Sequence, residues 1–252
     1  MSRSAPLPAE IEAIERATIA TVAHDAHEVI GPWILGLRPG SIGRAHSAAP
    51  LTHTLVRDDG LIARIEAAYR ARSMSPVFRL PEVEGLSSLA EALAERGYVP
   101  TQTTQVMSAD LASVAAVADP GPAMLLERPD EAWASVFLGE GFDPKDGAQR
   151  VAVLSNSPGA VFAAVRNEAG THAVGVLSLA EGWASLHGMR TRRDRRGQGL
   201  AGQVMARLAK AGLERGTSTV FLQVETGNAS ALALYGRAGF APLWRYHYWR
   251  LA

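Results

Sequence analysis

The segment between Arg192 and Val204, RRDRRGQGLAGQV, has the residue types and spacing to bind a phosphate. Apolar residues follow at helical spacing, so a helix is expected to begin directly after the glycines. The first amides of a helix lack intrahelical acceptors and lie at the positive end of its dipole, which makes them an anion site. Gly197 and Gly199 allow positive φ and a close approach of backbone to phosphate. A phosphate loop is therefore favoured over a nucleic-acid patch or a charged turn.

Three known phosphate-loop patterns can be compared with this segment. Walker A needs lysine and serine or threonine after its last glycine, and neither pair follows here, which argues against a nucleoside triphosphatase. The dinucleotide pattern Gly-x-Gly-x-x-Gly fits Gly197–Gly202, with Glu225 near the place of the acidic residue, so a Rossmann NAD(P)-dependent oxidoreductase stays open as an alternative. The pattern Arg/Gln-x-x-Gly-x-Gly/Ala fits Arg196, Gly199 and Ala201.

Two motifs in the same half of the chain resemble the GNAT superfamily of acyl-CoA-dependent N-acyltransferases. The first, MRTRRDRRGQGLAGQVMARL, resembles the strand, pyrophosphate loop and helix of that superfamily. The second, NASALALYGRAGF, resembles its Asn-x-x-Ala-x-x-x-Tyr-x-x-x-Gly-Phe pattern. The resemblance covers residues 123–252. It departs from the usual pattern at Arg193, where many members have proline.

The resemblance implies acetyl-CoA as co-substrate, with its pyrophosphate on the loop amides and its pantetheine arm paired to the preceding strand like an added strand. The implied cofactor-binding residues are Met189, Arg190, Thr191, Arg196, Gly197, Gln198, Gly199, Leu200, Ala201, Gly202, Asn228, Ala231 and Tyr235. Arg192, Arg193 and Arg195 either screen the 3′-phosphate or form a solvated turn.

Tyr235 is the candidate catalytic acid, because amine attack on a thioester expels a thiolate that a nearby phenol can protonate. Its alternative role is that of a core tyrosine. The attacking amine also needs a base. A strand through EGWASLHGM places Glu181 and His187 on one face, so both are candidates, as is Glu225 after the next strand. A structural histidine is the alternative for His187.

The elements that must position these residues follow from apolar periodicity and turn signals. In the second half, the pattern predicts two short helices, antiparallel strands turned at 167–170 and 181–182, a helix at 200–215, a strand, a helix at 230–238 and a last strand. In the first half it predicts helices at 9–22, 58–72 and 86–96 between short strands. The expected fold is α/β (α+β), with a mixed, mostly antiparallel sheet flanked by helices.

An internal similarity suggests tandem GNAT-like domains. GLSSLAEALAERGYVP (85–100) aligns without gaps with GNASALALYGRAGFAP (227–242), but Leu86 and Leu93 replace Asn228 and Tyr235. The first half also has no arginine-glycine loop before a helix. We therefore expect a degenerate GNAT-like domain at 1–118 and a catalytic domain at 123–252, joined by a linker at 112–123.

Composition limits the function further. Lysine and arginine number 25, as do aspartate and glutamate, and this zero net charge argues against a nucleic-acid partner. The absence of cysteine excludes disulfides and thiolate zinc sites and suits a cytoplasmic protein. No signal peptide or membrane span is expected. The sequence thus indicates an N-acetyltransferase without a metal, a monomer or homodimer, acting on a small-molecule or peptide primary amine; a non-catalytic CoA-binding sensor is the second possibility.

Overall fold

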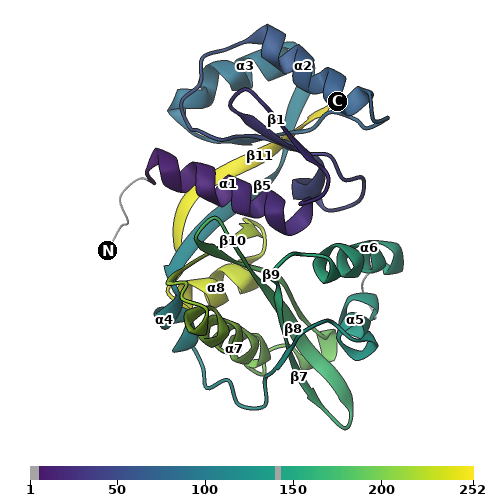
Figure 1. Ribbon diagram of the computed structural model, residues 1–252, viewed down its shortest axis with the longest axis vertical. Helices are drawn as coiled ribbons and strands as arrows, with labels where there is room; N and C mark the ends of the chain where they lie inside the picture. Colours follow the sequence, from purple (N-terminus) through teal and green to yellow (C-terminus); the bar gives the residue numbers. More distant parts are fainter. Residues whose placement is uncertain (1–5, 140–142) are drawn as a thin grey trace. The chain divides into compact units, whose positions relative to one another are not determined.

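The computed structural model describes residues 6–139 and 143–252, which divide into two compact units (Figure 1). The first unit comprises the described part of Met1–Val106 together with Gln223–Asn228 and Pro242–Ala252. The second unit comprises the described part of Met107–Leu222 together with Ala229–Ala241. The chain therefore passes between the two units four times, three times within a strand and once at Asn228, directly before a helix. Each unit is described by itself below.

The first unit is a sheet with helices on both faces. Its elements are α1 (Pro8–Val22), β1 (His27–Ile30), β2 (Trp33–Gly36), β3 (Ala48–Pro50), α2 (Asp59–Arg70), β4 (Phe78–Pro81), α3 (Ser87–Glu95), most of β5 (Tyr98–Asp110) and most of β11 (Ala241–Leu251). Short 3₁₀ turns lie at Gly43–His46 and Glu84–Leu86. β1, β2 and β3 pair antiparallel, β3 pairs parallel with β4, and β4 pairs antiparallel with β11.

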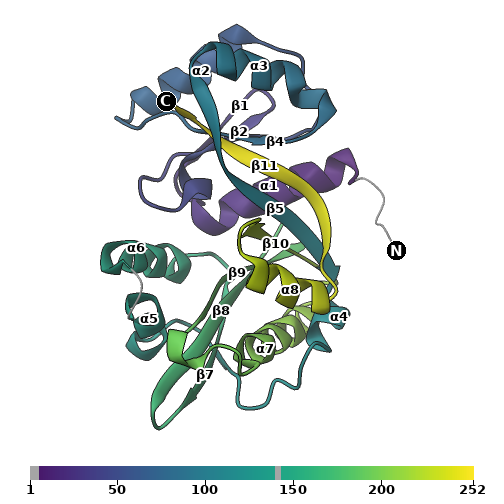
Figure 2. The ribbon, with the colours of Figure 1, turned by 180° about the vertical axis from the view of Figure 1, so that it is seen from behind.

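Alternation along β4 shows which helix covers which face of this sheet. Phe78 and Leu80 belong to the apolar core that includes α2 and α3. The intervening Arg79 points to the other face and donates both guanidinium NH2 groups to the carboxylate of Glu15 on α1, where both side chains are buried. Figure 2 shows α1 on one side of these strands and the α2–α3 pair on the other.

The second unit is a sheet of strand order β10-β9-β8-β7-β6, antiparallel except for β9 with β10. Its elements are α4 (Leu111–Ala115), β6 (Met124–Leu126), α5 (Glu131–Leu138), α6 (Pro144–Ser155), β7 (Val161–Asn167), β8 (Gly170–Ala180), β9 (Trp183–Thr191), a 3₁₀ turn (Arg193–Arg195), α7 (Leu200–Glu214), the first part of β10 (Thr219–Glu225) and α8 (Ala229–Arg237).

The two faces of the second sheet are covered by different helices. Val174 and Val176 of β8 pack in one cluster with Phe137 of α5. Between them, a methyl group on Gly175 would come within 2.8 Å of Val204 on α7, so α7 lies against the opposite face. Gly175 thus lets α7 approach the strand closely, and it brings the N-terminus of α7 to the end of β9.

These elements confirm the expected α/β class with a mostly antiparallel sheet. A Rossmann fold does not fit, because it needs a mostly parallel sheet. One expectation was wrong in detail. The expected linker at 112–123 begins within α4, whose Val114 is buried.

The internal similarity extends to backbone geometry. Gly97 follows α3 with φ of 85°, and Gly239 follows α8 with φ of 87°. Their amides donate to Ala94 O and Gly236 O, which occupy matching positions in the two aligned segments. The compact units are interleaved in sequence and differ from the segments 1–118 and 123–252, so tandem domains with those boundaries stay a prediction.

Candidate functional site

β9 carries an irregularity directly before the glycine-rich loop. Val174 of β8 pairs with Arg190 and Val176 pairs with His187, so β9 has one residue more than β8 over the same stretch. Gly188 has φ of 61°, which a β-bulge of this kind favours in glycine. β10 pairs with β9 at Ala184 and Ser185, before β9 reaches the bulge. The bulge therefore changes the direction of the strand where the pantetheine arm was expected.

The loop after β9 leads into α7 through two left-handed glycines. Gly197 and Gly199 have φ of 77° and 76°, and a methyl group on either would meet nothing within 4 Å. They are needed for backbone conformation rather than for internal space. The first helical hydrogen bond runs from Gln203 N to Gly199 O at 3.2 Å, so the amides of Leu200, Ala201 and Gly202 precede the helical ladder.

The loop is rich in positive charge but partly neutralised. Arg192 donates to both oxygens of Asp194, at 3.1 and 2.8 Å, and Arg195 lies 3.6 Å from the same carboxylate. Asp194 therefore forms ion pairs with Arg192 and Arg195. These are two of the three arginines expected either to screen the 3′-phosphate or to form a solvated turn. Arg196 and the glycines remain exposed to solvent, as an approaching phosphate requires.

Arg190, one residue after Met189 on β9, has a different environment. Its guanidinium lies over the Phe137 ring, 4.7 Å from the centroid, and the residue is half-buried. Burial, and secondarily the charge of Arg150, lowers the pKa of Arg190 to about 10, while Asp146 opposes the shift. Arg190 therefore stays cationic near neutral pH, and its contact with the Phe137 ring connects β9 with α5.

Tyr235 lies on α8, which lies inside the motif that begins at Asn228. Its ring is half-buried and meets the Phe240 ring at 5.7 Å between centroids, so the two aromatic residues of the motif pack on each other. Burial raises the pKa of Tyr235 to about 12. The phenol is therefore protonated over the whole neutral range, the state that a proton donor needs.

His187 lies in a buried hydrogen-bonded chain. Its Nε2 is 2.8 Å from Ser178 Oγ, which is 2.9 Å from Ser157 Oγ, and all three residues are buried. The ring is thus held by Ser178 of β8 and, through it, by Ser157 in the segment after α6, which suits a structural histidine as well as a base.

The other two candidate bases lie elsewhere. Glu181 was expected on the strand face of His187, and this was wrong. Glu181 and Gly182 form the two-residue turn between Ala180 and Trp183, with φ of 53° and 76°, and Glu181 is exposed. Glu225, at the end of β10, accepts a hydrogen bond from Gln102 at 2.8 Å in the first unit.

The remaining predicted cofactor-binding residues lie on the elements that the two motifs predicted for them. Met189 and Thr191 lie on β9, where Thr191 pairs with Ala173. Asn228 lies in the turn after β10, and its amide donates to Glu225 O at 3.0 Å; Ala231 lies in the first turn of α8. Gly188 was missed by sequence reasoning, although a glycine inside a strand pattern is a signal for a bulge.

Two negative findings apply to the described residues. Within 6–139 and 143–252, no group of three or more histidine, aspartate or glutamate side chains is arranged to hold a metal ion. In that same part of the chain, every helix is too short or too polar to cross a bilayer.

Comparisons with known proteins agree with this geometry. Residues 8–249 match the family described as "Probable histone acetyltransferase Rv0428c C-terminal". The chain is 25% identical over 244 residues to the "Uncharacterized N-acetyltransferase YobR" of Bacillus subtilis, covering 95% of this chain and 98% of that one. It is 47% identical to the Arabidopsis thaliana "N-alpha-acetyltransferase MAK3" over 55 residues, 21% of this chain and 29% of the relative.

Solved structures share the fold. A GCN5-related N-acetyltransferase from Kribbella flavida has a TM-score of 0.69 at 16% identity, covering 95% of each chain. A tandem GNAT protein from the clavulanic acid biosynthesis pathway has a TM-score of 0.58 at 15% identity, covering 97% of this chain and 96% of that one. Because the family model matches nearly the whole chain, the chain belongs to the Rv0428c C-terminal family of the GNAT superfamily and is an acetyltransferase.

Proposed function

We propose that the second unit binds acetyl-CoA and transfers its acetyl group to a primary amine in a ternary complex. The observation that carries this proposal is the pair of left-handed glycines, Gly197 and Gly199, that leads a bulged strand into α7. Amides from Arg196 to Gly202 then hold the pyrophosphate through charge-assisted hydrogen bonds. The backbone of Met189–Thr191 pairs with the pantetheine amides as an added strand would.

The chemical step follows from this placement. The neutral amine attacks the thioester carbonyl and forms a C–N bond, and collapse of the tetrahedral species breaks the C–S bond. The Tyr235 phenol gives its proton to the departing thiolate, and the proton of the attacking amine passes to a base, directly or through water. Tyr235 can serve as the acid because its raised pKa keeps it protonated.

His187 is the first candidate for the base, with Glu181 second. The buried hydrogen bond of His187 Nε2 to Ser178 fixes the ring, and Nδ1 is buried as well. Glu181 is exposed in a turn. We therefore expect His187→Gln to lower kcat only if a water relay reaches this ring. An unchanged kcat and pH profile would assign His187 a purely structural role.

The acceptor is a primary amine of a small molecule or a peptide. The matching family is described as a "Probable histone acetyltransferase" and the partial plant relative as an "N-alpha-acetyltransferase". Lysine side chains and α-amino groups of peptides are therefore the first acceptors to test, followed by small amines. Zero net charge does not select a strongly basic or acidic partner.

The first test is calorimetry with acetyl-CoA, followed by an assay of free-thiol release with an amine panel. Binding with turnover supports the proposal. Binding without turnover on any amine would support a CoA sensor instead, and an absence of acetyl-CoA binding would refute the proposal.

The second test is Tyr235→Phe, which keeps the ring contact with Phe240 and removes only the hydroxyl. We expect kcat to fall about 100-fold or more, with acetyl-CoA affinity nearly unchanged. Tyr69→Phe is the matched control, because it removes a hydroxyl that is bound to Gly36 O in the first unit. Full activity of Tyr235→Phe across the pH range would remove Tyr235 from the mechanism.

A further inference from the structure

The first unit contains a cavity with no role in the proposed acetyl transfer. It has a volume of about 440 Å³, within the range of small-molecule sites. It is lined by the end of β4, the 3₁₀ turn at Glu84–Leu86, α3 and β11. All of these segments belong to the first unit, so the cavity is complete within one compact body.

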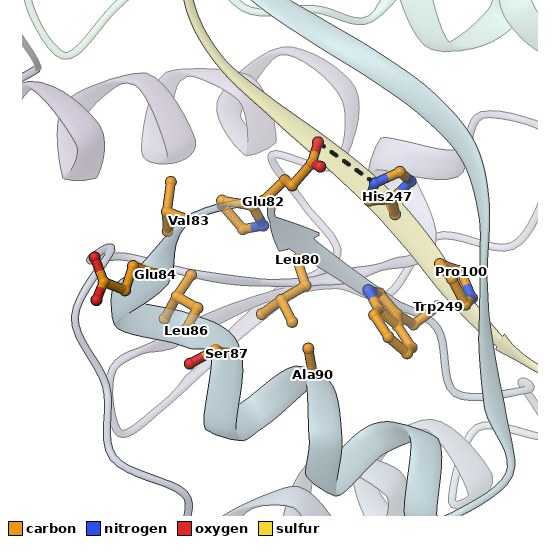
Figure 3. A pocket seen from close by; sticks show the side chains of 11 residues that line it. Leu80, Glu82, Val83, Glu84, Leu86, Ser87, Ala90, Pro100, His247 and Trp249 are labelled. Atoms are coloured by element: carbon orange, nitrogen blue, oxygen red, sulfur yellow. Dashed lines mark ion pairs between the residues drawn. The ribbon is translucent and has the colours of Figure 1, made fainter.

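The cavity has an apolar end and an acidic end. Leu80, Ala90 and Trp249 form the apolar end in Figure 3, while Glu82 and His247 lie together on the opposite side. Leu80 and Leu86 are part of the buried core of the unit, and Ala90 and Trp249 pack against that core. A bound apolar group would therefore extend the core instead of contacting a mobile surface.

The walls are held in place by backbone hydrogen bonds. Glu82 N donates to Arg245 O at 2.8 Å, and Leu55 N donates to Gly85 O at 3.0 Å. A methyl group on Gly85 would lie 2.3 Å from His53 O, so glycine is required for this close approach. The pairing of β4 with β11 fixes the floor. The cavity is therefore largely formed before any ligand binds.

The charge of the residues that line the cavity favours a ligand with positive charge. Glu82 and Glu84 are acidic, and no lysine or arginine is among the eleven described residues that line the cavity. His247 lies 3.7 Å from Glu82 and 3.2 Å from the Thr103 hydroxyl, which holds its ring at the rim. The Glu82 side chain is 59% exposed, so its carboxylate can be reached by a ligand. Such a lining attracts cations and repels phosphates.

We propose that this cavity binds a small organic cation, an ammonium group on an apolar or aromatic body. The body lies against Leu80, Ala90 and Trp249, whose indole face also attracts cations. The ammonium pairs with Glu82, beside His247. This site is independent of the proposed CoA site and does not depend on acetyl transfer.

The test follows the indole N–H signals of the full chain by NMR. The chain has five tryptophans, and Trp249→Phe identifies the signal that belongs to the cavity. The probes are 2-phenylethylammonium and n-hexylammonium, with 3-phenylpropionate as the anion of matched shape. We expect a saturable shift of the Trp249 signal with the cations at a Kd of about 1 mM or tighter, and little shift with the anion.

Two kinds of variant test the lining. Glu82→Gln should weaken cation binding about 3- to 10-fold at low salt, with a smaller effect at high salt, while Glu91→Gln on the exposed side of α3 should leave it unchanged. Ala90→Phe fills the apolar end and should abolish binding in a chain with unchanged remaining indole signals. The proposal is overturned if neither cation shifts the Trp249 signal, if the anion binds equally well, or if Glu82→Gln behaves like Glu91→Gln.

Discussion

The phosphate loop can be tested by a single methyl group at Gly199. Its φ of 76° lies in the left-handed region, and a Cβ there would meet nothing within 4 Å in the free protein. Gly199→Ala should therefore cost only the backbone strain of about 1–2 kcal/mol, without a steric clash. For a chain of this size, that strain lowers the thermal midpoint by roughly 2–8 °C.

Gly216 provides a matched control at the other end of the same helix. Its φ is 78°, a Cβ there would also meet nothing within 4 Å, and it is likewise exposed. Gly216→Ala should lower the thermal midpoint by the same amount as Gly199→Ala. Any difference between the two variants in cofactor binding then reports on the loop and not on folding.

The expected difference is large enough to measure by calorimetry. If the amides beside Gly199 hold the pyrophosphate, the added methyl should disturb one or two charge-assisted hydrogen bonds and weaken acetyl-CoA binding about 10- to 100-fold. At a ligand concentration of about 100 times the parent Kd, the parent gains about 2.7 kcal/mol, whereas a variant bound 30-fold more weakly gains only about 0.9 kcal/mol.

Two outcomes would refute this reasoning. The first is an acetyl-CoA affinity of Gly199→Ala equal to that of the parent protein, which would place the pyrophosphate elsewhere. The second is an equal loss of affinity in both variants, which would show that binding responds to helix stability alone.

Three further predictions concern buried and strained groups. Glu15→Gln leaves the Arg79 guanidinium without its counter-charge and should cost about 3–5 kcal/mol of unfolding free energy in urea, whereas Glu15→Leu with Arg79→Met should cost far less; equal costs would contradict a charge-based explanation. Burial lowers the pKa of His53 from 6.5 to about 4, so the unfolded chain binds a proton there as the pH falls through this window, and stability falls with it. His53→Phe should remove about 1–2 kcal/mol of that loss in urea titrations from pH 6.5 to 4, after allowance for solvent screening, and an unchanged loss would refute this role. Gly188→Ala should lower the thermal midpoint more than Gly182→Ala, because both have positive φ but only the bulge glycine has a side chain 3.0 Å from the added methyl.

The local sequence pattern was sufficient to predict most helices and strands and the glycine-rich loop before α7. Helical periodicity after Gly199 indicated α7, Asp58 predicted the start of α2, where it accepts from Leu61 N at 2.9 Å, and Gly97 and Gly239 marked two helix ends. These features depend on a few adjacent residues, so the sequence shows them directly. The resemblance to the GNAT superfamily, since confirmed, has the same origin in two short motifs.

Non-local pairing decided what the sequence left open. Glu181 was predicted to lie in a strand, but the pairing of Ala180 with Trp183 makes it a turn residue. The extra residue of β9 at Gly188 depends on pairing with β8, and the buried bond of His187 depends on Ser178 and Ser157, which are distant in sequence.

The sequence by itself therefore determined the family, the candidate phosphate loop and the candidate acid, because each is encoded in a contiguous stretch with a local physical meaning. Tertiary structure alone decided the strand register, the surroundings of the candidate bases and the acidic cavity of the first unit. That cavity joins β4 and α3 to β11, which are about 160 residues apart along the chain. Such juxtapositions arise from the packing of the whole unit, and no local pattern of residue types specifies them.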